Sequence, residues 1–289
     1  MTLLRPAAVV LLALFAAGCT PKQVVVRTTA LLLPDAVAAM NAEPDLEIAR
    51  TAAGADLKLA EGLLRADPRN RELAAITAQG FASYALAFVE DKDPDRAAGL
   101  YLRGKEIGLA ALSQDRRLKA ALHGSDADFA AAVQHIGQSR KDLLLWTAAC
   151  WGKWVDLSRT DPAAIADLPR VEALWRRLLA LDETYYYAAP HLFLGIFYGA
   201  RSPMLGGRPA EAREHFERAI ALTGGKFLMA RLYFAQYYAR QTMDRALFEE
   251  QLGLILHAPD DLLPEMRLAN TVAKERAAEL LARVDEWFD

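Results

Sequence analysis

The pattern of apolar and polar positions is helical along almost the whole chain after residue 34. Ala and Leu dominate, and the period-two alternation that is typical of strands is nearly absent. Helix-breaking pairs recur and leave stretches of ~12–20 residues between them. These pairs are Asp67-Pro68, Asp93-Pro94, Asp161-Pro162, Ser202-Pro203, Gly206-Gly207, Gly224-Gly225 and Ala258-Pro259. The pattern predicts an all-α protein built as an antiparallel array of helical hairpins.

One hairpin shows a distinct arrangement of small and aromatic residues. Gly195 lies three residues before Tyr198 on its first helix. Ala212, Phe216 and Ala219 follow on its second helix at spacings of four and three. Small residues let paired helices approach closely, and the aromatic ring fills the space between neighbouring hairpins.

An earlier hairpin repeats this arrangement. Ala97, Tyr101 and Gly104 lie on its second helix, and Gly80 lies on its first. The two units resemble the tetratricopeptide repeat, which implies an α-solenoid of about four hairpins.

Both clear units are about five residues longer between their helices than a tetratricopeptide repeat. The insertions are Glu90–Asp95 and Arg201–Gly207. We expect two further helix pairs and a capping helix that closes the array. The pairs are Leu143–Ser158 with Val171–Leu181 and Phe227–Gln241 with Arg245–His257, and the capping helix is Pro264–Phe288.

The N-terminus has the features of a targeting segment. Arg5 is its one cation, and Pro6–Ala17 carries no charge, which fits a secretory signal and is too short to span a membrane. The segment ends in Phe15-Ala16-Ala17-Gly18-Cys19, which resembles the lipobox of bacterial lipoproteins, with Ala16 in place of the usual Leu. The alternative is an ordinary signal peptide with a chance cysteine.

The lipobox resemblance implies that Cys19 is acylated and becomes the new N-terminus. We therefore predict a signal peptide over residues 1–18, a lipid-anchored tether over 19–44 and a helical-repeat domain over 45–289. No other stretch is expected to span a bilayer, so membrane attachment would depend on the lipid. Thr20 follows Cys19 where Asp would indicate inner-membrane retention, which favours the outer membrane, facing the periplasm.

Composition excludes several classes of protein. The chain has 289 residues, 53% of them hydrophobic, and a net charge of −3. A disordered chain has fewer apolar residues, and a nucleic-acid-binding protein usually has a basic excess. With Cys19 acylated, Cys150 is the one remaining thiol, and its apolar surroundings predict a buried, inert group.

Apparent catalytic and metal-binding motifs are incomplete. Thr223-Gly224-Gly225-Lys226 suggests a phosphate loop, but Phe227 stands where the Mg²⁺-binding hydroxyl belongs. Asp91, Asp93 and Asp95 alternate as in a calcium loop, yet Arg96 replaces the turn glycine. The five histidines lack metal-ligand spacing, and no GxSxG motif occurs. We therefore expect no metal, no cofactor and no enzyme, unless the fold assembles distant titratable residues in a cleft.

Aromatic residues concentrate in the middle of the chain. Trp146, Trp151 and Trp154 lie on one predicted helix, and Tyr185–Tyr187 lie at the turn into the next. Most aromatic rings of a helical array are core, but three consecutive tyrosines cannot all face one core. Some of these residues and nearby cations are candidates for lining a channel or binding a partner. The candidates are Trp151, Trp154, Tyr187, Phe197, Tyr198, Arg201, Lys226, Tyr237 and Arg240.

Several longer runs resemble the T-component of tripartite ATP-independent periplasmic (TRAP) transporters. The resemblance extends over roughly residues 45–257. The runs are Trp151–Trp154, Ala164–Leu174, Pro190–Tyr198, Pro203–Gly207, His215–Ala219, Tyr237–Gln241 and Ser83–Asp91.

This resemblance implies a periplasmic lipoprotein that docks the solute-binding protein of a TRAP transporter. It also implies a small organic solute, carboxylated or apolar, and homo-oligomers with a pore-like channel. The alternative function is a tetratricopeptide-type scaffold for outer-membrane or envelope assembly. No nucleic-acid partner is expected.

Overall fold

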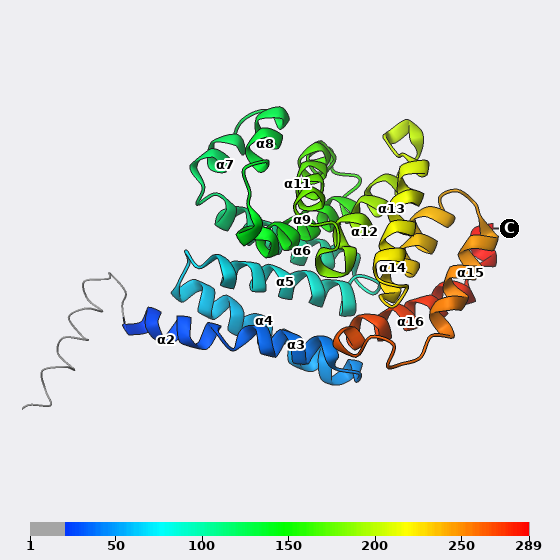
Figure 1. Cartoon of the computed structure of the whole chain (residues 1–289), viewed down its shortest axis with the longest axis horizontal. Helices are drawn as coiled ribbons and strands as arrows, with labels where there is room; N and C mark the ends of the chain where they lie inside the picture. Colours follow the sequence, from blue (N-terminus) through cyan, green and yellow to red (C-terminus); the bar gives the residue numbers. More distant parts are fainter. Residues whose placement is uncertain (1–20, 289) are drawn as a thin grey trace, which may run out of the picture.

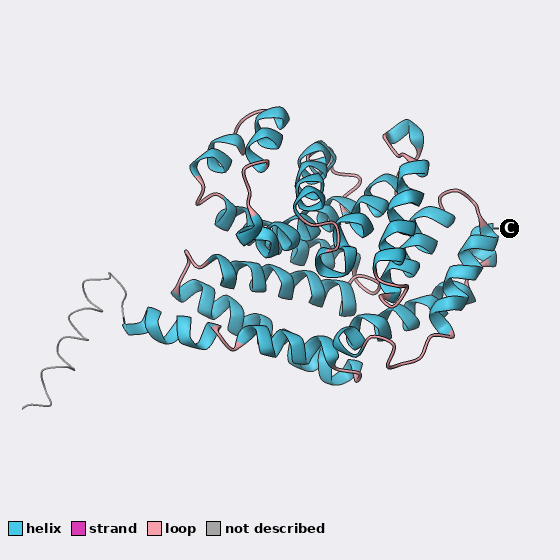
Figure 2. Ribbon diagram, viewed as in Figure 1, coloured by secondary structure: helices cyan, strands magenta, loops and turns pink. Residues whose placement is uncertain are grey.

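The computed structural model describes residues 21–288, and this part of the chain contains helices, turns and loops but no strand (Figure 2). Successive helices pack as adjacent pairs, so the predicted all-α array of hairpins is confirmed (Figure 1). The α-helices are α2 (Pro21–Ala30), α3 (Leu33–Ala42), α4 (Leu46–Ala66), α5 (Arg71–Phe88), α6 (Pro94–Leu112), α7 (Arg116–Ala121), α8 (Asp126–Val133), α9 (Lys141–Leu157), α10 (Pro162–Ala166), α11 (Leu168–Leu181), α12 (Tyr185–Gly199), α13 (Pro209–Leu222), α14 (Leu228–Tyr233), α15 (Arg245–Leu256), α16 (Arg267–Ala282) and α17 (Asp285–Phe288). A π-helix, Phe234–Ala239, follows α14 directly.

Two of the three Asp-Pro pairs in the sequence start helices, whereas Asp67 of the third pair ends α4. The Asp93 carboxylate accepts a hydrogen bond from the backbone N–H of Arg96 at 3.0 Å, and Pro94 occupies the first helical position of α6. Asp161 caps α10 in the same way, ahead of Pro162. Proline is tolerated at this position because its missing N–H would have no partner inside the helix.

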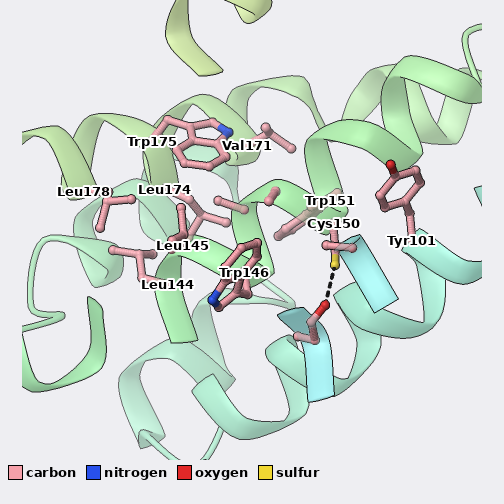
Figure 3. Packing of buried hydrophobic residues seen from close by; sticks show 14 of the residues in the cluster. Tyr101, Leu144, Leu145, Trp146, Cys150, Trp151, Val171, Leu174, Trp175 and Leu178 are labelled. Carbon is pink, nitrogen blue, oxygen red and sulfur yellow. Dashed lines mark hydrogen bonds between the residues drawn. The ribbon is translucent and has the colours of Figure 1, made fainter. Parts of the chain in front are cut away.

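Helices α6 and α9 approach closely because two glycines face α9. A Cβ built on Gly104 would lie 2.4 Å from Cys150 Sγ, and one on Gly108 would lie 2.1 Å from Thr147 Oγ1. Cys150 is fully buried and donates to the carbonyl of Ala78 at 3.4 Å (Figure 3). Burial also raises the pKa of this thiol, which fits the predicted inert group.

The α12–α13 hairpin uses the small and aromatic positions that the sequence indicated. A Cβ on Gly195 would lie 3.0 Å from the Phe216 ring. Phe216, Ala212 and Ala219 are all fully buried. The tetratricopeptide-like packing is therefore present in this unit.

The three consecutive tyrosines adopt a backbone that the sequence did not predict. Tyr186, Tyr187 and Ala188 have φ values of 45°, 58° and 58°, so the chain makes a left-handed turn before the regular part of α12. A left-handed backbone costs an L-residue roughly 1–2 kcal/mol. The turn sends the rings in different directions: Tyr186 packs edge-on against Trp146, and Tyr187 stacks on Phe227.

The predicted capping helix Pro264–Phe288 is interrupted, whereas a single continuous helix was expected. It is divided into α16 and α17, and α16 also contacts α3 and α4, so a helix from the C-terminal part of the chain packs against helices from its N-terminal part (Figure 1). Arg276 of α16 donates to the carbonyl of Leu86 at 2.6 Å and pairs with Asp91 at 2.7 Å.

The predicted tether is helical where the structure describes it. Arg27 of α2 pairs with buried Asp67 at 2.8 Å, and Val26 and Ala30 pack on Leu73. By length and composition alone, Lys22–Ala42 could cross a membrane, so the expectation that no other segment could do so is wrong on this criterion. Cys19 and the signal segment lie outside the described residues.

We predict that Gly104→Ala destabilises the protein by about 1–3 kcal/mol, because the added methyl group overlaps Cys150. Gly99→Ala on the same helix is the matched control, since a Cβ there meets nothing within 4 Å. It should stabilise the protein by about 0.5–1 kcal/mol through helix propensity. Urea denaturation measures the change in the free energy of unfolding for both variants. Equal changes for the two substitutions would contradict the close packing of α6 on α9.

Candidate functional site

An apolar pocket of about 130 Å³, partly open to solvent, lies among α5, α6, α9, α12, α14 and α16; we call it the central cavity. Its apolar walls include Leu86, Leu145, Leu192, Met229 and Val272. A second apolar cavity of about 140 Å³ lies between α3, α4 and α5. Asn41, Ser83 and Leu268 line both cavities, so the two are neighbours across these side chains.

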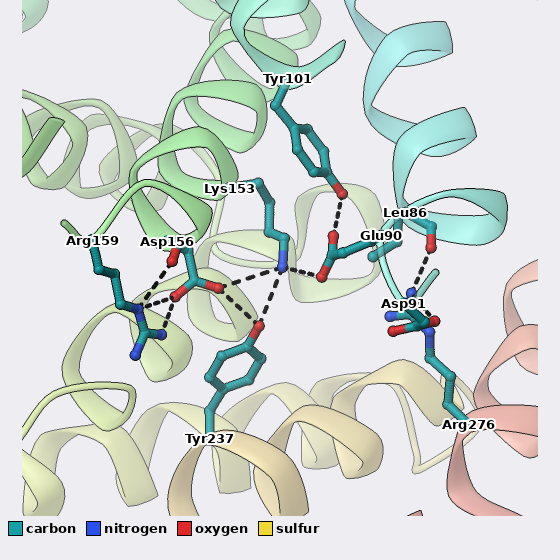
Figure 4. Close-up of polar contacts among 9 residues, drawn as sticks. All are labelled: Leu86, Glu90, Asp91, Tyr101, Lys153, Asp156, Arg159, Tyr237 and Arg276. Carbon is teal, nitrogen blue, oxygen red and sulfur yellow. Dashed lines mark hydrogen bonds and ion pairs between the residues drawn. The ribbon is translucent and has the colours of Figure 1, made fainter. Parts of the chain in front are cut away.

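One wall of the central cavity carries a buried charge. The ammonium group of Lys153 is 2.6 Å from Glu90 Oε1 and 3.5 Å from Asp156 Oδ2, and it donates to the Tyr237 hydroxyl at 3.2 Å (Figure 4). The Tyr101 hydroxyl donates to the other oxygen of Glu90 at 2.5 Å. We call these five residues the Lys153 network.

Different elements supply the members of the Lys153 network. Lys153 and Asp156 are one turn apart on α9, whereas Glu90 lies in the loop that follows α5. Tyr237 lies in the π-helix and also donates to Asp156 at 3.1 Å. A π-helix adds a residue to a turn, which changes the direction of the side chains that follow.

Lys153 and Asp156 of the Lys153 network keep their charges at neutral pH. Burial alone would lower the pKa of Lys153, but the adjacent Glu90, Tyr237 and Asp156 outweigh it and raise the pKa well above its usual value. Burial likewise opposes ionisation of Asp156, and Lys153 and Arg159 lower its pKa overall. The wall is therefore an ion cluster with internal partners.

A larger pocket of about 470 Å³ lies on the other side of Lys153 and Phe193, between α9, α11 and α12 and the loop after α12; we call it the outer pocket. Trp175 and Phe193 contribute stacked rings whose centroids are 4.4 Å apart. Phe197 and Arg201 also line it, and the Arg201 guanidinium lies 4.1 Å from the Phe197 ring centroid. The structure thus brings together two of the residues that the sequence selected.

Three other candidates have side chains with internal partners. Trp151 is buried, and its indole N–H donates to Asp167 at 2.7 Å. Tyr198 is also buried, and its hydroxyl donates to Glu172 at 2.7 Å. Tyr237 is a member of the Lys153 network. None of the three lines either the central cavity or the outer pocket.

The remaining candidates are dispersed. Trp154 is half-buried beneath the ammonium of Lys105, at 3.8 Å from the ring centroid. Tyr187 is half-buried on Phe227. Lys226 and Arg240 are exposed, and Arg240 stacks on Trp287 at 4.5 Å. Their roles as channel or partner contacts stay predictions.

Sequence reasoning missed the polar residues of the cavity wall. Lys153 is the sole charge within the apolar stretch Leu143–Val155, and a lysine in such a position is rarely buried unless it is paired. That feature could have identified Lys153. Its partner Glu90, 63 residues away, could not be found from spacing.

The described residues form a helical-repeat scaffold with pockets lined mainly by apolar side chains. The family model of the TRAP transporter T-component matches residues 42–288, so the chain belongs to this family. An uncharacterized protein of Treponema pallidum (strain Nichols) is 22% identical over 262 residues, which cover 85% of this chain and 81% of that protein. The family is one of transporter accessory proteins, not enzymes.

We predict that Lys153→Met destabilises the protein by about 3–5 kcal/mol, because it leaves the buried Glu90 carboxylate without its cation and leaves Asp156 with Arg159 alone. Lys58→Met is the matched control: this lysine pairs with Glu61, but its side chain is 70% exposed. It should change the free energy of unfolding by less than about 1 kcal/mol. Chemical denaturation at pH 7 measures the free energy of unfolding of both variants. A Lys153→Met protein as stable as the wild type would show that the ion pairs of Lys153 contribute little to stability.

Proposed function

We propose that this protein is an accessory lipoprotein of a TRAP transport system that docks the periplasmic solute-binding protein and binds a small apolar or carboxylated solute. The observation that carries the proposal is the family match over residues 42–288. The central cavity supports the solute part, since pockets for small molecules are mostly apolar with a few placed polar groups.

The proposed location is the periplasm, with a lipid on Cys19 that holds the protein to the membrane, by preference the outer membrane. The apolar segment Pro6–Ala17 supports export, because it is consistent with a signal sequence. Homo-oligomers with a channel stay a prediction from the family resemblance.

Exposed apolar side chains support one docking region. Met204 and Leu205, at the tip of the loop after α12, are 96% and 71% exposed. Leu205 also lines the outer pocket. Exposed apolar groups of this kind lose unfavourable contact with water when a partner covers them, so we place the solute-binding protein at this loop.

We predict that Met204→Asp combined with Leu205→Asp weakens the complex with the solute-binding protein by roughly tenfold or more, because binding would desolvate the new charges. Ile48→Asp is the control, since Ile48 is 57% exposed on α4. Cross-linking of the lipidated protein in its host, followed by identification of the partner, measures the effect.

If the cross-linked partners are outer-membrane assembly proteins, the scaffold function replaces the transport function. If the solute-binding protein is captured equally by the wild type and the double variant, docking occurs but not at this loop.

A second prediction concerns the central cavity. Ala269 of α16 lines it and is only half-buried, so Ala269→Phe should narrow it with little strain. We expect the affinity for the neutral fluorescent probe N-phenyl-1-naphthylamine to fall roughly tenfold. Ala210→Phe on the exposed face of α13 should leave that affinity unchanged. Equal probe binding by both variants would exclude the central cavity as the apolar site.

A further inference from the structure

The outer pocket contains a cation whose charge is not balanced. The Arg201 side chain donates from Nε and Nη2 to the carbonyl of Phe197, at 3.1 and 2.7 Å. Within residues 21–288, no carboxylate lies within ion-pair distance of its guanidinium. A guanidinium group has five N–H donors, so three remain for a ligand.

Two neighbouring arginines add positive potential at Arg201 and oppose the larger attraction of Glu172. Arg159 lines the same pocket and, with Arg208, lies close enough to repel Arg201. Asp156 is the acidic residue in the pocket lining, and it is already held by Lys153 and Arg159. Burial, with a smaller effect from these arginines, lowers the pKa of Arg201 from its usual value. An anion placed here would relieve this repulsion.

Glu172 is the acidic group that acts most strongly on Arg201, but it is engaged elsewhere. It accepts from Arg176 Nε at 2.8 Å and from the Tyr198 hydroxyl at 2.7 Å. Two partners therefore already share the charge of this carboxylate, which is not part of the outer-pocket lining.

The rest of the outer pocket is shaped for an apolar body. The stacked rings of Trp175 and Phe193 contribute to its lining, together with Val155 and Val171. Ser202, which follows Arg201 in the sequence, also lines it. A volume of about 470 Å³ is within the range of small-molecule sites.

We propose that the outer pocket binds the carboxylate group of a small organic acid at Arg201, with the apolar body of the acid packed along Trp175 and Phe193. The planar guanidinium of an arginine matches a carboxylate in geometry and charge. Phe197 holds the Arg201 guanidinium in place, because its ring lies under the cation and its carbonyl accepts a hydrogen bond from it. This inference deepens the proposed function by naming the solute class of one site. It is tested on the purified protein alone, so its failure would leave the docking proposal intact.

The test is calorimetric titration of the purified protein with octanoate and with neutral octanamide, which has the same chain length. We expect saturable binding of octanoate, weaker binding of octanamide and a loss of octanoate affinity at high salt. Arg201→Gln should weaken octanoate binding roughly 10- to 100-fold, the usual effect of removing a charge-assisted hydrogen bond. Arg213→Gln, at an exposed arginine on α13 that pairs with Glu217, should not change it.

Ser202→Asp keeps Arg201 in place and supplies a competing carboxylate beside it, so it should also abolish binding. This variant separates ligand recognition from any effect of Arg201 on folding, and circular dichroism confirms that each variant is folded. The proposal is overturned if the wild type does not bind octanoate or binds octanamide equally well. It is also overturned if folded Arg201→Gln and Ser202→Asp proteins bind octanoate like the wild type.

Discussion

The buried ammonium group of Lys153 is the constraint on which the interior of this protein depends. A charge taken out of water must be neutralised nearby, and here Glu90, Asp156 and the Tyr237 hydroxyl converge on it from three elements. The α5–α6 loop, α9 and the π-helix are thereby held in one relative position. A hydrophobic side chain at residue 153 could fill the same space, but it would not specify this arrangement of partners.

Lys153 also lies between two pockets that differ in polarity, the central cavity and the outer pocket. Both the central cavity and the outer pocket are lined by Lys153 and Phe193. The cavity side is almost wholly apolar, whereas the outer side contains the unbalanced cation Arg201. A solute with an apolar body and an acidic group finds both apolar contacts and a counter-charge in the outer pocket, whereas the central cavity offers mainly apolar contacts. The family's association with transport is consistent with such neighbouring sites.

The sequence predicted the helical array well because local signals specify it. Asp93 and Pro94 mark a helix start, and Gly195 with Phe216 marks a close helix pair, so the pattern alone is informative. The polar contacts of the site depend on long-range packing and could not be predicted. Glu90 and Arg201 illustrate this, since both belong to the insertions that depart from the tetratricopeptide length, and a repeat pattern carries no information about an insertion. The left-handed turn at Tyr186 was missed for a different reason, because its residue types do not favour that backbone.

The central claim is that this chain is a binding accessory of a TRAP system, and the most direct measurement is a titration between two purified proteins. Residues 20–289 are titrated with the TRAP solute-binding protein of the same host, with and without solute. The account predicts a saturable complex of defined stoichiometry whose affinity changes when solute is present. The absence of any complex at protein concentrations of about 100 μM, well above the expected Kd, would contradict it.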